Sequence, residues 1–121
     1  MLTAGKQSEE EQRLNAVLQR LSGITFVPEN WNESDFWATL SETGCSEEEL
    51  LEKSPDRLFR KFIDAQWTWE QVEKLADILV ELASKKSDDT MRSRARDLYL
   101  FIQAESKMFS FNIMNKLNNL K

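Results

Sequence analysis

A chain of 121 residues with 40% apolar and 31% charged residues has the composition of a folded globular protein, which excludes a disordered chain. Only three glycines and two prolines occur, and helix-forming residues are abundant, so we expect a nearly all-helical fold. The formal net charge of −5 disfavours binding to nucleic acid or to an anionic membrane, because both depend on a dense positive field.

The chain is expected to form one domain over residues 1–121, in which residues 1–7 are a flexible tail. No interior stretch is rich enough in proline, glycine and serine to act as a linker. We recognise neither a secretory signal nor a run of about 18 apolar residues that would cross a membrane. Cys45 is the single cysteine, so the chain forms no internal disulfide, and we expect a cytoplasmic protein.

Helix-start signals recur along the chain and predict a compact all-α bundle of about six to seven short helices. Each signal begins with a Ser, Thr or Asn that can cap free helix amides, and most have Glu, Asp or Gln three residues later. The predicted capping residues are Ser8, Asn32, Ser46, Ser54, Thr68 and Ser110.

The first helix is expected to end at Gly23, where a left-handed residue is favoured. Residues 24–28 are rich in β-branched and aromatic side chains and end in proline. We interpret this segment as an extended linker and not as a strand, because the chain offers no second strand to pair with it.

The longest helical pattern begins at Trp69 and continues to about residue 85. Apolar residues at positions 69, 72, 75, 76, 79, 82 and 83 fall on one face, and charged residues occupy the opposite face. A polar turn follows, and then a helix over about 90–107 whose middle is apolar almost all round. The pattern therefore predicts a helix hairpin whose second helix is contacted from two sides.

This hairpin, over about 76–104, resembles a tetratricopeptide unit. The residues that match its alternation of large and small side chains are Leu79, Leu82, Ala83, Ala95 and Tyr99. The chain departs from the pattern at Lys86, Ile102 and Lys107, where an aromatic, a small residue and a proline are expected. The resemblance implies a protein-binding scaffold. Because a single unit cannot bury its own faces, the flanking helices or a second copy must complete the core.

The chain has no histidine, the commonest general base and transition-metal ligand. We therefore expect no catalytic residues, no metal and no cofactor. Cys45 at a helix start is interpreted as a small apolar contact and not as a nucleophile. Glu73, Asp77 and Glu81 share one helix face, which we interpret as solvated and partly paired with Lys74 and with basic residues of a neighbouring helix.

The basic residues of the second half do not predict a nucleic-acid site. Its one cluster comprises Lys85, Lys86, Arg92, Arg94 and Arg96. Arginines at alternate positions of a helix point in different directions, so they form no row that follows a phosphate backbone.

The function that these observations favour is a non-catalytic protein–protein interaction module that binds a partner protein or self-associates. Its contact surface is expected in the aromatic and methionine-rich second half, at Tyr99, Phe101, Met108, Phe109, Phe111 and Met114. The alternative is a small-molecule-binding or enzymatic domain with an internal pocket. Such a pocket would be lined by Tyr99 and tryptophans and would use carboxylates such as Glu105 or Asp64.

Overall fold

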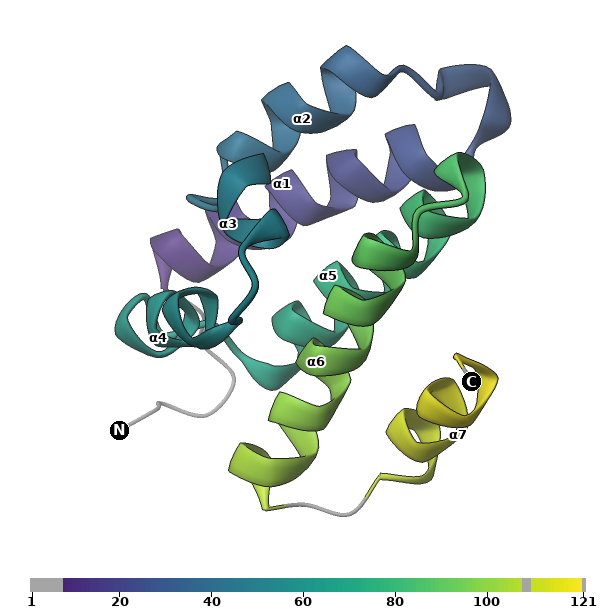
Figure 1. The fold of residues 1–121 in the computed structure, drawn as a ribbon. Coiled ribbons are helices and arrows are strands. Elements are labelled where there is room, and N and C mark those ends of the chain that lie inside the picture. Colours follow the sequence, from purple (N-terminus) through teal and green to yellow (C-terminus); the bar gives the residue numbers. More distant parts are fainter. Residues whose placement is uncertain (1–7, 108–109, 121) are drawn as a thin grey trace.

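The computed structural model describes residues 8–107 and 110–120, and in this part of the chain it contains seven α-helices and no strand (Figure 1). The all-α prediction is therefore confirmed. In chain order the elements are α1 (Glu9–Phe26), the short 3₁₀ helix η1 (Pro28–Asn30), α2 (Glu33–Ser41), α3 (Glu47–Leu51), α4 (Asp56–Asp64), α5 (Trp69–Lys86), α6 (Asp89–Ser106) and α7 (Phe111–Asn119). No described helix has the length and apolar character that crossing a bilayer requires.

Most of the predicted helix starts are confirmed by hydrogen bonds from backbone amides to the capping side chain. Those confirmed are Ser8, Asn32, Ser46, Thr68 and Ser110. Two of them, Ser46 and Thr68, form complete capping boxes with the side chain three residues later. The prediction at Ser54 is off by one residue, because Pro55 occupies the N-cap position of α4 and Ser54 Oγ accepts from the Asp56 amide.

The first helix is longer than predicted. It continues through Gly23 to Phe26, so the extended conformation expected for residues 24–28 is wrong for its first three residues. Thr25 is buried in this last turn, and its hydroxyl donates to the Leu21 carbonyl at 2.7 Å. The helix ends at Phe26, two residues before Pro28, which has no amide hydrogen and restricts Val27 before it.

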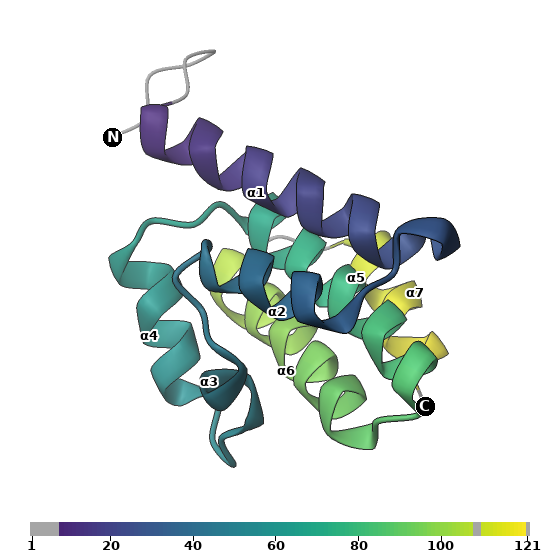
Figure 2. The ribbon, with the colours of Figure 1, turned by 90° about the horizontal axis from the view of Figure 1, so that it is seen from above.

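The α5–α6 hairpin lies at the centre of the fold (Figures 1 and 2). α1 packs across α5 and also contacts α2. α3 and α4 lie at one side of the hairpin, near α6. Ser87, with a left-handed φ of 51°, ends α5 and donates its amide to the Ala83 carbonyl. Asp88 then caps α6 by accepting from the amides of Thr90 and Met91.

The buried side chains form one continuous core to which all seven α-helices contribute. Its centre is the apolar face of α5, where Leu75, Leu79 and Leu82 have no exposed surface. The end of α3 is held differently. Arg94 of α6, only 4% exposed, donates to the carbonyls of Leu50 and Glu52, which have no partner within so short a helix.

Candidate interaction surface

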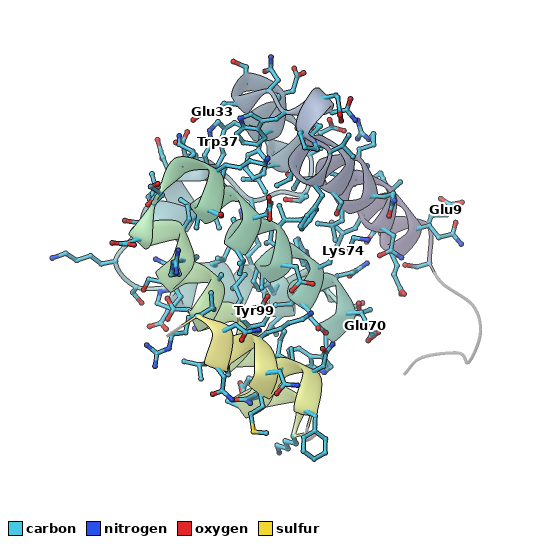
Figure 3. The ribbon with its side chains drawn as sticks, turned by 90° about the vertical axis from the view of Figure 1, so that its right-hand side faces the viewer. Glu9, Glu33, Trp37, Glu70, Lys74 and Tyr99 are labelled. Carbon is cyan, nitrogen blue, oxygen red and sulfur yellow. The ribbon has the colours of Figure 1, made fainter. Side chains whose placement is uncertain are left out.

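The charged face of α5 remains accessible between α1 and α7. Residues 70, 73, 74 and 77 are three or four apart, so they project from one side of the helix, opposite its buried stripe. In Figure 3, α7 lies beside the hairpin, and Lys74 and Glu70 project from α5 on the side of α1. This face is where we place the candidate site.

On its α7 side, the face holds a cluster of ion pairs and hydrogen bonds. Lys116 of α7 lies 2.5 Å from Glu73 Oε2 and 3.0 Å from Asp77 Oδ1. Asn112, one helical turn earlier, donates to Glu73 Oε2 at 3.2 Å. Ile113 is buried beside them. These contacts attach α7 to the α5–α6 hairpin through both charge and apolar burial.

Tyr99 of α6 lies beneath this cluster and is 1% exposed. Its hydroxyl donates to Asp77 Oδ1 at 2.5 Å, and Lys116 Nζ lies 5.9 Å from the centre of its ring. Burial raises the pKa of Tyr99, and the charges of Asp77 and Glu73 raise it further. Burial lowers the pKa of Lys116, but hydrogen bonds to Glu73 and Asp77 outweigh it and leave that pKa raised. Neither group exchanges a proton near neutral pH.

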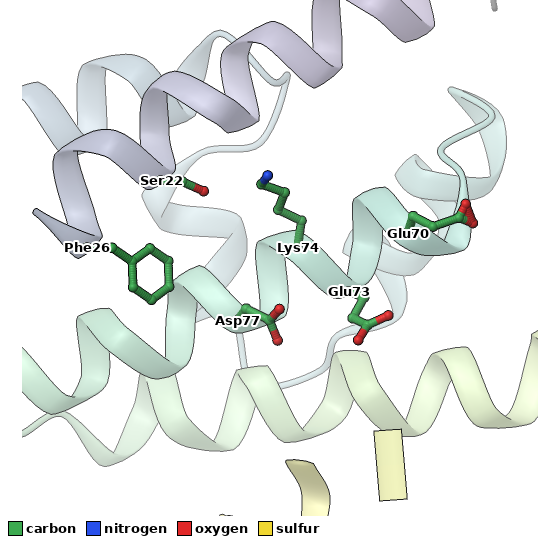
Figure 4. A pocket seen from close by; sticks show the side chains of 6 residues that line it. All are labelled: Ser22, Phe26, Glu70, Glu73, Lys74 and Asp77. Carbon is green, nitrogen blue, oxygen red and sulfur yellow. The ribbon is translucent and has the colours of Figure 1, made fainter. Parts of the chain in front are cut away.

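On its α1 side, the same face forms the floor of an open groove with a volume of about 360 Å³ (Figure 4). The groove is lined by Ser22, Phe26, Glu70, Glu73, Lys74 and Asp77. Figure 4 shows Lys74 pointing towards α1, whereas Glu73 and Asp77 point towards the side of α7. Phe26, the last residue of α1, has 47% of its surface exposed at one end of the groove.

The predicted interface residues divide into three groups. Tyr99 and Phe101 are buried, and Phe101 stacks on Phe59 with 4.2 Å between ring centres, so these two side chains belong to the core and offer no surface to a partner. Phe111 is 69% exposed at the start of α7, and Met114 is partly buried. The remaining two, Met108 and Phe109, lie outside the described residues.

Three carboxylates of α5 lie beside lysines. Glu73 and Asp77 both bind Lys116, and Glu81 lies 3.9 Å from Lys85. Among residues 8–107 and 110–120, no group of three or more histidine, cysteine, aspartate or glutamate side chains is arranged to hold a metal ion.

The thiol of Cys45 is buried, with 1% of the residue exposed. Burial raises its pKa to about 11, which keeps the sulfur protonated at neutral pH. A protonated, enclosed thiol is a poor nucleophile, so this residue acts in the core as a small apolar side chain.

The basic cluster predicted from the sequence is dispersed in the structure. Lys86 pairs with Glu33 of α2, and Lys85 lies 5.3 Å from the centre of the Trp31 ring. Arg94 is buried against the end of α3. Of the three arginines of this cluster on α6, only Arg92 and Arg96 are exposed. The five basic residues therefore share no common surface.

The internal pocket of the alternative hypothesis does not match the groove. Glu105 and Asp64 are both exposed, and neither lines it. The four tryptophans are partly buried and pack against the core. The carboxylates that do line the groove come from α5.

Sequence reasoning missed two residues that define this site. Phe26 lies in the segment that the sequence predicts to be extended. The prediction therefore does not place this residue at a helix end beside α5. Lys116 had a visible signal, since it interrupts the apolar positions 113, 117 and 120 of α7. A lysine within such a stripe indicates a carboxylate on the facing helix.

Comparisons of the chain with protein-family models, curated proteins and solved structures gave no match. The resemblance of the α5–α6 hairpin to a tetratricopeptide unit therefore stays a prediction. The site is interpreted from its own geometry alone.

Proposed function

We propose that this protein is a non-catalytic interaction module that binds a partner segment in the groove between α1 and α5. The observation that supports it most directly is Phe26, a large apolar side chain with 47% of its surface exposed at the end of an open groove. Exposed aromatic side chains beside a concave surface are typical of binding anchors.

The charges of the groove specify the chemistry of the partner. Glu70, Glu73 and Asp77 contribute three negative charges, which exceed the two positive charges of Lys74 and Lys116. Lys74 is directed to α1, where it donates to Gln19 at 3.2 Å. The favoured occupant is therefore a peptide with an apolar side chain against Phe26 and a lysine or arginine next to Glu70.

The helix hairpin suits this role because it presents the groove on a rigid support. A tetratricopeptide-like character for α5 and α6 is part of the proposal, since such hairpins present concave surfaces to peptides. A cytoplasmic location is part of it as well, and the single free thiol of Cys45 supports that location.

The proposal is tested by selecting binders from a random peptide library on the full chain. We expect the selected peptides to be enriched in lysine or arginine adjacent to an apolar residue. Their binding, measured by fluorescence anisotropy, should weaken at least about tenfold for Phe26→Asp, which corresponds to the loss of one anchor contact.

Ile63→Asp is the matched control, because Ile63 is also an exposed apolar residue, 57% accessible, but lies on α4 away from the groove. It should leave the affinity of the selected peptides unchanged. Peptides that lose affinity with Ile63→Asp but not with Phe26→Asp would place the binding surface elsewhere, and a library that yields no binder would reject the proposal.

A small organic cation is a second candidate occupant. The groove volume of about 360 Å³ lies within the range of ligand sites, roughly 300 to 1,000 Å³. Thermal shift assays with alkyl and aromatic amines distinguish this case, since stabilisation that is lost in Glu70→Gln would identify an amine site. No tryptophan lines the groove, so a melting temperature is a better reporter than tryptophan fluorescence.

A further inference from the structure

The last helix, α7, depends on its docking surface to exist as a helix. It has nine residues, and isolated helices shorter than about 12 residues are marginal in water. Ile113 is its one buried residue, and Leu117 and Leu120 are only partly buried against the core. This small apolar footprint indicates that α7 is among the first elements to detach.

The register of α7 is set by polar contacts that do not depend on which copy of the chain supplies the helix. Lys116 binds Glu73 and Asp77, and Asn112 binds Glu73, so every one of these acceptors lies on α5. A second copy presents the same two carboxylates and the same apolar surface. The α7 of one copy can therefore make the same contacts with α5 of the other copy that it makes within its own chain.

The end of α6 contains backbone strain that opening would release. Lys107 follows α6 in the left-handed region, with φ of 57° and ψ of 20°. A residue with a Cβ atom is disfavoured there, whereas glycine is not. If α7 leaves its site, Lys107 is free to adopt right-handed helical angles, and strained connections of this kind favour exchange between copies.

From these three observations we propose that α7 exchanges between two copies of the chain, and that each α7 docks on the α5–α6 hairpin of the other copy in a reciprocal dimer. The same contacts form within one chain or between two. The dimer therefore competes with the local concentration of the tethered helix, and it is favoured as protein concentration rises.

Two charge variants, mixed together, test the exchange. Lys116→Glu turns α7 negative against its own Glu73 and Asp77. Glu73→Lys combined with Asp77→Asn makes the docking surface positive but keeps an acceptor for the Tyr99 hydroxyl. Each variant alone repels its own α7, whereas in the mixture each α7 meets an attractive surface on the other chain.

The expected result is measured by size-exclusion chromatography with light scattering. Each variant alone should elute with the mass of one chain, 14.2 kDa, and the equimolar mixture should approach twice that mass. The control is the chain that combines all three substitutions. Its own α7 is attracted to its own docking surface, so the increase in mass seen for the mixture should disappear. Circular dichroism verifies that each variant retains its helix content.

Lys107→Gly in the otherwise unchanged chain is an independent test. Glycine removes the strain at this position, so the dimer fraction at high protein concentration should fall severalfold. A mixture that keeps the mass of single chains, together with a dimer fraction that Lys107→Gly leaves unaltered, would overturn the proposal. Phe26→Asp should not affect exchange, which separates a failure here from a failure of the proposed groove.

Discussion

Gln71 shows how one side chain can serve two structural purposes in this protein. Its Oε1 accepts from the Thr68 amide at 2.9 Å, which completes the capping box of α5. Its Nε2 donates to Asn15 Oδ1 at 2.9 Å and to the Glu11 carbonyl at 3.3 Å, both on α1. The same amide therefore starts α5 and aligns α1 on it, which explains why a glutamine is 3% exposed at this position.

This double use predicts unequal losses within one capping box. Thr68→Ala removes the cap alone and should lower the free energy of unfolding by about 1 kcal/mol. Gln71→Ala also leaves polar groups of α1 without their partner, so its loss should be about 2 kcal/mol or more. Urea denaturation measures both values. Thr90→Ala, an exposed threonine that caps no helix, is the control, and equal losses for Thr68→Ala and Gln71→Ala would contradict the interpretation.

At the scale of elements, α3 is the shortest α-helix and is held at both ends by side chains from elsewhere. At its start, Glu49 accepts from the Ser46 amide and lies 2.7 Å from Lys61 of α4. At its end, Arg94 of α6 binds the last carbonyls. Five residues make too little helix to persist alone, so these contacts determine its conformation.

The environment of Glu49 predicts a pH-dependent contribution to stability. Burial raises the pKa of its carboxyl, but hydrogen bonds from Lys61 and Ser46 outweigh it and leave the pKa below its usual range. A carboxyl with a lowered folded-state pKa stabilises the fold above its unfolded-state pKa, and this stability is lost as the pH falls through the folded-state value.

Chemical denaturation between pH 7 and pH 3 measures this contribution. We expect Glu49→Gln to destabilise the protein at pH 7 and to flatten the decline in stability on the acid side. Glu48→Gln, an exposed neighbour on the same helix, is the matched control and should retain the decline. A parallel decline in Glu49→Gln and the wild-type chain would rule out the role assigned to Glu49.

At the scale of the whole molecule, one core joins helices that are far apart in the sequence. α5 contacts α1 on one side and α6 on the other, and its apolar stripe is buried from Val72 to Ala83. No described helix has a core of its own, because the buried residues form a single cluster. The chain should therefore unfold in one cooperative transition over these elements, with α7 detaching first.

Leu79 at the centre of α5 tests this organisation. It has no exposed surface, so Leu79→Ala should lower the free energy of unfolding by about 2 to 5 kcal/mol. The midpoint should shift while the transition remains single when followed by circular dichroism and tryptophan fluorescence. Leu100→Ala, on an exposed part of α6, should cost far less, and a harmless Leu79→Ala would show that α5 is not the central helix.

Most of the fold could be predicted from local chemistry. Capping side chains act within three residues of their targets, so Ser46 and Thr68 were recognisable without knowledge of distant contacts. The end of α1 could not be predicted in the same way. Gly23 permits a helix end without requiring one, and the buried Thr25 with its bond to Leu21 favours another turn.

The candidate site was less accessible to sequence reasoning, because it depends on which helices become neighbours. The acidic face of α5 was identified, and its pairing with a basic residue of a neighbouring helix is confirmed by Lys116. Which side chains complete the groove was not predictable, since Phe26 approaches α5 only through the packing of α1. Tyr99 was expected at a surface, but its ring fills the space between the two helices of the hairpin and α7.

The buried guanidinium of Arg94 has a consequence for the order in which the chain is completed during synthesis. It binds the Leu50 carbonyl, 44 residues earlier, and that carbonyl lies at the end of a helix too short to satisfy it. A ribosome releases α3 well before α6, so this end of α3 must remain hydrated until residue 94 has emerged. The end of α3 therefore reaches its final arrangement only after α6 has been synthesised.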